Sequence, residues 1–234
     1  IWRVIGLAVF LLVRPTEKLF DTGESVSYAT ILGQKSFLLF FIPWIMFCLI
    51  NQTSAPIIAN FFGEGFINFS AAIEGTLTGA FAIIGGSFCD KIGRKRVAMS
   101  GFVMLGIGYA VLGILPDIVG WYIYSATDGL AWGIFYTIFF MTIWGDLAHD
   151  KPSEKYYAIG ELPYLFSNFL RLMLGSYIAG TVVMYAIFSL ASFFLFLAVL
   201  PLMYAPETLP EKKIRERELK TYIEKAKKAK EKYA

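Results

Sequence analysis

The sequence contains one histidine, His149, and two cysteines, Cys48 and Cys89, among its 234 residues. Both cysteines fall in or at the end of apolar segments, so neither a disulfide framework nor a thiolate metal site fits them. The sequence also lacks the Gly-x-Ser-x-Gly, His-Glu-x-x-His and Gly-x4-Gly-Lys-Ser/Thr motifs of hydrolases, metalloproteases and ATPases. We therefore expect no metal, no cofactor, no catalytic residue and no ATP-driven step within this chain.

Charge is also scarce: 17% of the residues are charged, 57% are hydrophobic and the mean hydropathy is +0.60. A soluble domain of this length needs more polar surface. Apolar runs of about twenty residues recur, and that length lets a helix cross a bilayer core of about 30 Å. The sequence thus predicts an all-α, polytopic membrane protein with a six-helix transmembrane bundle over residues 37–205. The expected spans are 37–60, 67–89, 97–115, 119–145, 157–179 and 181–205.

Lysine and arginine are distributed unevenly among the connections between these spans. The alternate connections 61–66, 116–118 and 178–181 contain none. The remaining connections and the tail contain Arg14, Lys18, Lys35, Lys91, Arg94, Lys95, Arg96, Lys151, Lys155 and ten more after Pro206. By the positive-inside rule, the basic connections and both ends of the chain are expected in the cytoplasm. We expect a multi-pass protein of the cell membrane that does not bind nucleic acid.

Polar residues inside the spans gather at one depth. At 1.5 Å per helical residue, Asp128 and Arg171 lie about 14 Å from the outer helix ends, Asn51 and Gln52 about 15 Å and Glu74 about 10 Å. Half of the bilayer core is about 15 Å, so four spans place polar groups near the midplane. Such groups are costly in lipid and are typical of a transport pathway. The expected solute-binding residues are Asn51, Gln52, Asp128, Trp132, Tyr136, Asn168 and Arg171, and the proton-coupling candidates are Glu74 and Asp128.

Other interpretations of these residues stay open at this point. Asp128 and Arg171 could pair with each other as a structural bridge, and Glu74 could cap a helix at the lipid interface. Trp132 and Tyr136 fit core packing as well as a stacking surface for a sugar. Pro56 favours a binding role for the preceding segment, because it frees the carbonyl of Gln52 from the helical hydrogen bonds.

Three short motifs point to a family. The stretch GGSFCDKIGRKR, residues 85–96, resembles the signature Gly-x-x-x-Asp-(Arg/Lys)-x-Gly-Arg-(Arg/Lys) of the major facilitator superfamily, through Gly86, Asp90, Lys91, Gly93, Arg94 and Lys95. The stretch PETLPE, residues 206–211, is similar to the Pro-Glu-Ser/Thr motif that follows spans six and twelve, and PTEK, residues 15–18, resembles a degraded copy. The stretch NQTSA, residues 51–55, resembles the Gln-Gln-x-Ser-Gly element of sugar-transporting members and departs from it at Asn51 and Ala55.

The resemblance implies spans seven to twelve of a twelve-span carrier, whose N-terminal six-helix half is a partner alongside the solute and the lipid bilayer. Residues 1–13 would end span six, 14–36 would form the cytoplasmic linker between the halves, and 206–234 a charged cytoplasmic helix. It further implies that Gly86, Asp90, Gly93, Arg94 and Lys95 gate the conformational change and do not bind solute.

The expected function is secondary active transport of a small polar or anionic solute, such as a sugar or an organic acid, by alternating access with proton coupling as an option. Alternatives are a drug/proton antiporter and a non-transporting sensor or scaffold on a carrier fold.

Overall fold

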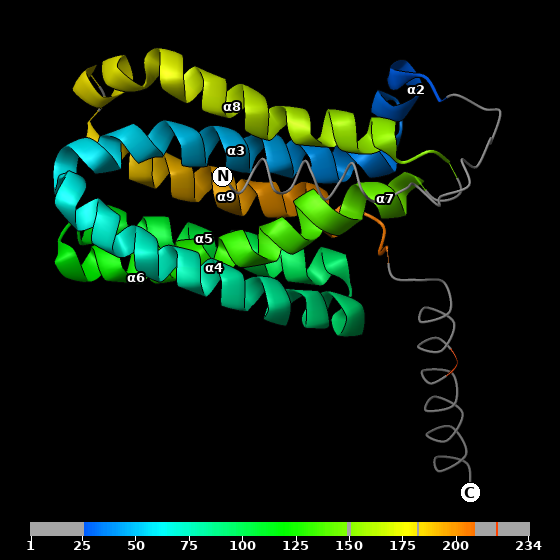
Figure 1. The fold of residues 1–234 in the computed structure, drawn as a ribbon, viewed down its shortest axis with the longest axis horizontal. Coiled ribbons are helices and arrows are strands. Elements are labelled where there is room, and N and C mark those ends of the chain that lie inside the picture. Colours follow the sequence, from blue (N-terminus) through cyan, green and yellow to red (C-terminus); the bar gives the residue numbers. More distant parts are fainter. Residues whose placement is uncertain (1–25, 149–150, 182, 209–218, 220–234) are drawn as a thin grey trace, which may run out of the picture.

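The computed structural model describes residues 26–148, 151–181, 183–208 and 219, and every regular element in this part of the chain is helical (Figure 1). The predicted all-α fold is therefore confirmed. The expected span end at 1–13, the first part of the linker 14–36 and nearly all of the C-terminal helix 206–234 lie outside the described residues.

The elements follow one another with short connections. They are α2 (Tyr28–Leu32), α3 (Lys35–Phe62), α4 (Glu64–Ile92), α5 (Arg94–Ile114), α6 (Ile118–Phe135), the π-helix η1 (Tyr136–Thr142), α7 (Ile143–Ala148), α8 (Glu154–Thr181) and α9 (Met184–Tyr204). The segment α6–η1–α7 is one continuous rod, Ile118–Ala148. Gly63 and Gly93 end α3 and α4 with φ of 85° and 105°, values that favour glycine. The Asp117 side chain caps α6 by accepting a hydrogen bond of 2.8 Å from the Gly120 amide.

Within the described part of the chain, five helical segments are long and apolar enough to cross a membrane: Lys35–Phe62, Asn68–Ile92, Arg94–Ile114, Ile118–Ala148 and Tyr185–Tyr204. The remaining predicted span corresponds to α8, which has 28 residues but is not among the five. Glu161 and Arg171 lie inside it and lower its hydropathy. α8 nevertheless packs along α3 (Figure 1).

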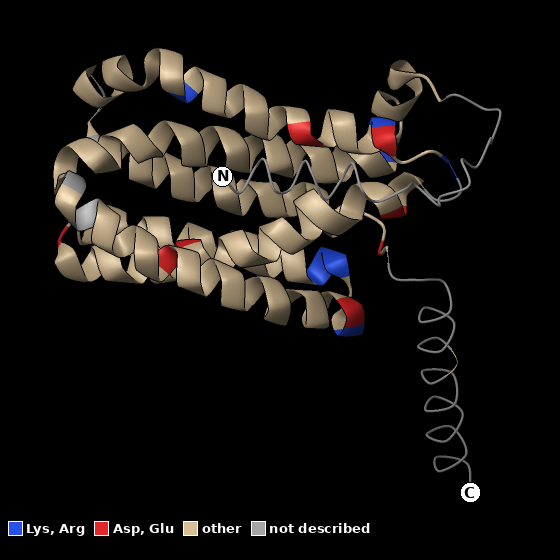
Figure 2. Cartoon of the chain, in the orientation of Figure 1, with Lys and Arg blue, Asp and Glu red and all other residues tan. Residues whose placement is uncertain are grey.

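The helices pack in an order that differs from their order in the chain. The main contacts connect α8 to α3, α3 to α9, α9 to α5, α5 to α6 and α6 to α4, so α8 and α4 stand at the two ends of the series (Figure 1). Charged residues concentrate at the helix ends near α2 and α7, and few lie within the bundle (Figure 2).

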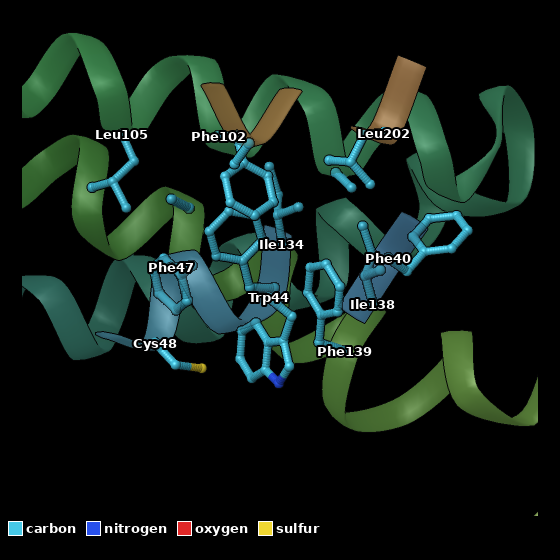
Figure 3. Close-up of a cluster of buried hydrophobic side chains, with 14 of the residues drawn as sticks. Phe40, Trp44, Phe47, Cys48, Phe102, Leu105, Ile134, Ile138, Phe139 and Leu202 are labelled. Carbon is cyan, nitrogen blue, oxygen red and sulfur yellow. The ribbon is translucent and has the colours of Figure 1, made fainter. Parts of the chain in front are cut away.

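Large side chains fill the core between α3, α5, η1 and α9 (Figure 3). The Trp44 ring stacks on Phe139 with centroids 4.6 Å apart and planes 9° apart, and Phe47 packs against Phe135 at 4.6 Å. Aromatic pairs of this kind contribute about 0.5–1.5 kcal/mol each beyond the area they bury. Because lipid offers no hydrophobic drive for helix association, close packing of this kind is what holds the bundle together.

The π-helix η1 interrupts the longest rod and was not predicted. Its wider turn places both Phe139 and Phe140 against Trp44, at centroid distances of 4.6 and 5.4 Å. Within it, the Thr142 hydroxyl donates to the carbonyl of Thr137, five residues earlier, at 3.0 Å. π-Segments are rare and are often found at functional sites.

Candidate functional site

A cavity of about 390 Å³ lies where four helices meet. Ala55, Pro56, Ile58 and Ala59 of α3, Glu74 of α4, Trp121, Tyr124 and Asp128 of α6 and Arg171 of α8 line it. Three of the residues predicted from membrane depth, Glu74, Asp128 and Arg171, are therefore brought together around one space. The remaining lining is apolar or aromatic, which is typical of small-molecule sites.

Asp128 is the most deeply placed charge of this cavity, with 6% of its surface exposed. Its Oδ1 accepts a hydrogen bond of 3.2 Å from Asn51 Nδ2 on α3. Burial of a charged carboxylate in a low-dielectric region is costly unless hydrogen bonds or opposite charges compensate. The neutral neighbours of this carboxylate, Asn51 and the Tyr124 hydroxyl, compensate only in part, so Asp128 retains capacity to accept a proton or a cationic group.

Glu74 faces the same space from α4 and is close enough to Asp128 for the two carboxylates to interact electrostatically. The position of Glu74 along the bundle is fixed by close packing of α4 on α6 at Gly129. A Cβ on Gly129 would lie 2.9 Å from the Glu74 carbonyl oxygen. The Thr78 hydroxyl, one turn further along, donates to the Gly129 carbonyl at 3.1 Å. These contacts hold both carboxylates at one level of the bundle.

Arg171 contributes the positive charge of the cavity from α8, and its side chain is exposed. Among the described residues it forms neither an ion pair nor a hydrogen bond, so the structural bridge between Asp128 and Arg171 that the sequence left open is not formed here. The guanidinium is available to an anionic group in the cavity.

The two aromatic residues of the cavity, Trp121 and Tyr124, were not predicted. The Trp121 indole nitrogen donates to the buried hydroxyl of Ser70 on α4, and the Tyr124 hydroxyl donates to that of Tyr109 at 3.3 Å. Both lie on the Asp128 face of α6, seven and four residues before it. That helical spacing was the signal in the sequence that could have identified them.

The other predicted solute-binding residues do not line the cavity. Trp132 packs against Phe47 at 4.9 Å, and Tyr136 stacks on Phe140 at 4.8 Å, so both belong to an aromatic layer beyond the cavity. Gln52 is buried on α3, with 6% of its surface exposed, and Asn168 is half-buried on α8. A binding role for these four residues stays a prediction.

The residues expected to gate the conformational change form a second site at the start of α5. Arg94 is almost buried, and its Nη1 lies 2.7 Å from Asp146 Oδ2 of α7 and donates to the Thr208 carbonyl at 2.7 Å. Lys95 Nζ donates to the Met203 carbonyl of α9 at 2.7 Å. Basic side chains of the 85–96 motif therefore connect α5 to α7 and to the end of α9.

The carboxylate of Glu207 completes this second site. It covers Gly93, where a Cβ would overlap it, and its Oε1 accepts from the Lys95 amide at 3.5 Å and from the Thr208 amide at 3.1 Å. A carboxylate at a helix N-terminus is stabilised by the helix dipole. Asp146 and Glu207 were not predicted as gating residues, although Glu207 lies in the PETLPE stretch.

The remaining gating candidates lie on the last turns of α4. Asp90 is exposed there. Gly86 faces η1, where an added Cβ would contact Thr137 Cγ2 at 3.6 Å, and the Thr137 hydroxyl donates to the Ala82 carbonyl at 2.9 Å. The small residue allows α4 to approach the rod closely.

Glu161 on α8 was not predicted either. Both of its carboxyl oxygens are buried, and its neighbour is the indole nitrogen of Trp144 on α7. Neither group makes a hydrogen bond of standard geometry in the described part of the chain. The adjacent Gly160 packs directly on the Trp144 ring, and its carbonyl accepts a hydrogen bond of 3.0 Å from Trp44.

The described residues contain no cluster of three or more histidine, cysteine, aspartate or glutamate side chains suited to a metal ion. Cys48 and Cys89 are both buried thiols without a disulfide.

In a comparison with known protein families, the model of the Major Facilitator Superfamily matches residues 5–231. Neither a curated protein nor a solved structure matches the chain.

Proposed function

Because the chain belongs to the major facilitator superfamily, a family of membrane transporters, we propose that it is a secondary active transporter of a small polar or anionic solute. It moves this solute by alternating access, with a proton as the coupling ion. In this proposal the chain supplies spans seven to twelve of a twelve-span carrier in the cell membrane, and the N-terminal six-helix half supplies the other wall of the pathway. The connections that carry the basic residues face the cytoplasm.

The cavity around Asp128, Glu74 and Arg171 is the observation that carries this proposal. Charged groups inside a membrane bundle are costly and are kept where they serve a pathway. Here they converge from three helices on one space of about 390 Å³, and a fourth helix, α3, contributes Pro56 and its neighbours. Such convergence of charged groups from several helices of a membrane bundle supports a carrier site.

Alternating access requires contacts that form in one state and break in the other. The second site, at the start of α5, supports this part of the proposal, because Arg94 forms one ion pair with Asp146 of α7, and hydrogen bonds of Arg94 and Glu207 connect α5 to the end of α9. An ion pair can exchange partners when helices tilt, whereas an apolar core cannot be rearranged without repacking.

The pair of carboxylates supports the proposal of proton coupling. Glu74 and Asp128 repel each other when both are ionised, and one proton taken up by the pair relieves that repulsion. Arg171 is the cation of the same cavity, so solute binding at Arg171 and proton binding at the carboxylates change each other's free energy.

Counterflow in liposomes tests the proposal. The full-length protein is reconstituted, solutes that raise its melting temperature are identified, and exchange of a labelled solute is measured. Asp128→Asn is expected to abolish counterflow while the protein stays folded, because it removes the buried charge of the cavity. The matched control is Asp117→Asn, a change at the start of the same helix that keeps a capping side chain and should keep counterflow.

Solute binding without counterflow in the unaltered protein would favour a sensor or scaffold and contradict the transport proposal.

A further inference from the structure

We infer that the transported solute is a zwitterion, a small molecule that carries one cationic nitrogen and one carboxylate; this inference rests on the proposed transport function. The inference comes from the placement of charge around the cavity, which separates two carboxylates from one guanidinium.

The two signs of charge come from opposite ends of the helix series. Glu74 and Asp128 belong to α4 and α6, which pack on each other at one end, whereas Arg171 belongs to α8 at the other end (Figure 1). The α3 residues Pro56 and Ala59 also line the cavity, and α3 contacts both α8 and α4. The cavity is therefore negative on one side and positive on the other.

The groups of opposite charge are not paired with each other. Asp128 accepts a hydrogen bond from Asn51, and Arg171 has no ionic partner among the described residues. Opposite charges in one low-dielectric space attract strongly, so a separation of this kind indicates that each group is kept for another partner.

A zwitterion is the solute class that satisfies both sides. An anion would pair with Arg171 and leave two carboxylates without a cation, and a cation would do the reverse. A neutral sugar would leave all three charges uncompensated, which is costly in a site away from water. A zwitterion places its carboxylate at Arg171 and its cationic nitrogen at Asp128 and Glu74.

The lining between the two charged sides fits the body of such a molecule. Pro56, Ile58 and Ala59 offer apolar contacts, and Trp121 and Tyr124 of α6 line the cavity together with Asp128 of the same helix. Aromatic side chains beside a carboxylate also favour an ammonium group, through cation–π attraction.

Charge balance links the zwitterion to the proton. The three ionised side chains sum to one negative charge, and a zwitterion adds none. One proton on Asp128 or Glu74 makes the loaded cavity neutral. The inference therefore predicts that one proton accompanies each zwitterion.

The test uses solutes with one carbon skeleton and different charges. The full-length carrier is purified, and ω-amino acids from glycine to 6-aminohexanoate, together with glycine betaine, are compared with the matching alkyl carboxylates and alkylamines. Melting temperature reports binding, and counterflow in liposomes reports transport. At least one zwitterion should bind about thirtyfold or more tightly than its matched carboxylate and its matched amine, because each lacks one charge partner.

Variants then test which residue binds the carboxylate of the solute and which binds its cationic nitrogen. Arg171→Gln should reduce the preference for the zwitterion over the amine, and Asp128→Asn should reduce its preference over the carboxylate. Arg171→Lys keeps the charge and should keep the order of preference at lower affinity. Asp117→Asn, outside the cavity, should change neither ratio. Melting curves without solute show whether each variant is folded.

The outcomes separate this inference from the proposed function. If a simple anion or amine is transported and binds as tightly as any zwitterion, the inference of a zwitterionic solute is wrong, but the proposed transport function is kept. The inference is also wrong if none of the solutes that bind is a zwitterion. If no solute that binds shows counterflow, the proposed transport function itself is wrong.

Discussion

Arg94 at the start of α5 forms an ion pair with Asp146 of α7, with Nη1 and Oδ2 2.7 Å apart. The same nitrogen donates to the carbonyl of Thr208, beyond the end of α9. The two side chains are 11% and 23% exposed, so the pair is screened much less than one on an open surface. One guanidinium therefore connects three segments that lie far apart in the sequence.

Asp146→Asn should destabilise the protein by about 2 kcal/mol, between the values for exposed and buried ion pairs. It should also slow transport without removing solute binding, because the pair lies outside the cavity and sets the balance between states. Melting temperature, solute binding and counterflow measure the three effects. Arg96→Gln, which removes an exposed charge from the same turn, is the control and should be nearly neutral. Loss of solute binding in a folded Asp146→Asn protein would contradict a gating role.

Gly93→Ala should be strongly destabilising. Its φ of 105° is rarely adopted by other residues, which costs about 1–3 kcal/mol, and the new methyl group would overlap the Glu207 carboxylate. Gly86→Ala is the matched control in the same motif, because its methyl group would meet Thr137 at an ordinary 3.6 Å. Thermal unfolding of the two variants should therefore differ clearly. Equal melting temperatures would show that the turn at Gly93 is not held as described.

Gly160→Ala should loosen α8 from the rod. The added methyl group would overlap the Trp144 indole, and overpacking of this kind costs about 1–3 kcal/mol. Gly180→Ala, near the other end of α8, meets no atom within 4 Å and should be neutral or slightly stabilising. Melting temperatures of the purified variants compare the two. An unchanged melting temperature in Gly160→Ala would argue against the packing of α8 on α7.

Cysteine labelling tests the orientation in the membrane. Glu64→Cys, at the start of α4, should react with a membrane-impermeant maleimide from outside, and Ser153→Cys, before α8, should react only after the membrane is opened. Cys48 and Cys89 are 1% and 2% exposed and should contribute little background. The reverse pattern would invert the topology.

Much of the fold was accessible from the sequence because its determinants are local. Long apolar runs identify helices, and Gly63, Gly93 and Asp117 mark where α3, α4 and α6 end or begin. The π-helix η1 was not accessible, because it depends on how Phe139 and Phe140 pack against Trp44 from a different helix. The contact of Arg94 with Asp146 was missed for the same reason: it depends on the packing of α5 beside α7.

The sequence predicted the depth of the candidate site residues in the membrane, but it only partly predicted which of them face the cavity. Counting residues from the helix ends brought Glu74, Asp128 and Arg171 to one level, and the structure places all three on one cavity. Helical periodicity shows which residues share a face, but it does not show which helix that face meets. Trp132, four residues after Asp128 on that face, therefore packs against Phe47, whereas Trp121, seven residues before Asp128 on the same face, lines the cavity.

The central claim is that Asp128 and Arg171 bind a solute in one cavity of a carrier and do not form a structural ion pair with each other. The measurement is counterflow by the full-length protein carrying Asp128→Arg together with Arg171→Asp, with each single variant measured alongside. The structure shows no ion pair between these residues, and Asn51 could not balance an arginine at position 128 with a negative charge. We predict a folded double variant, verified by its melting curve, that does not transport. Counterflow near the level of the unaltered protein would contradict the account, because it would show that only the presence of the two opposite charges matters.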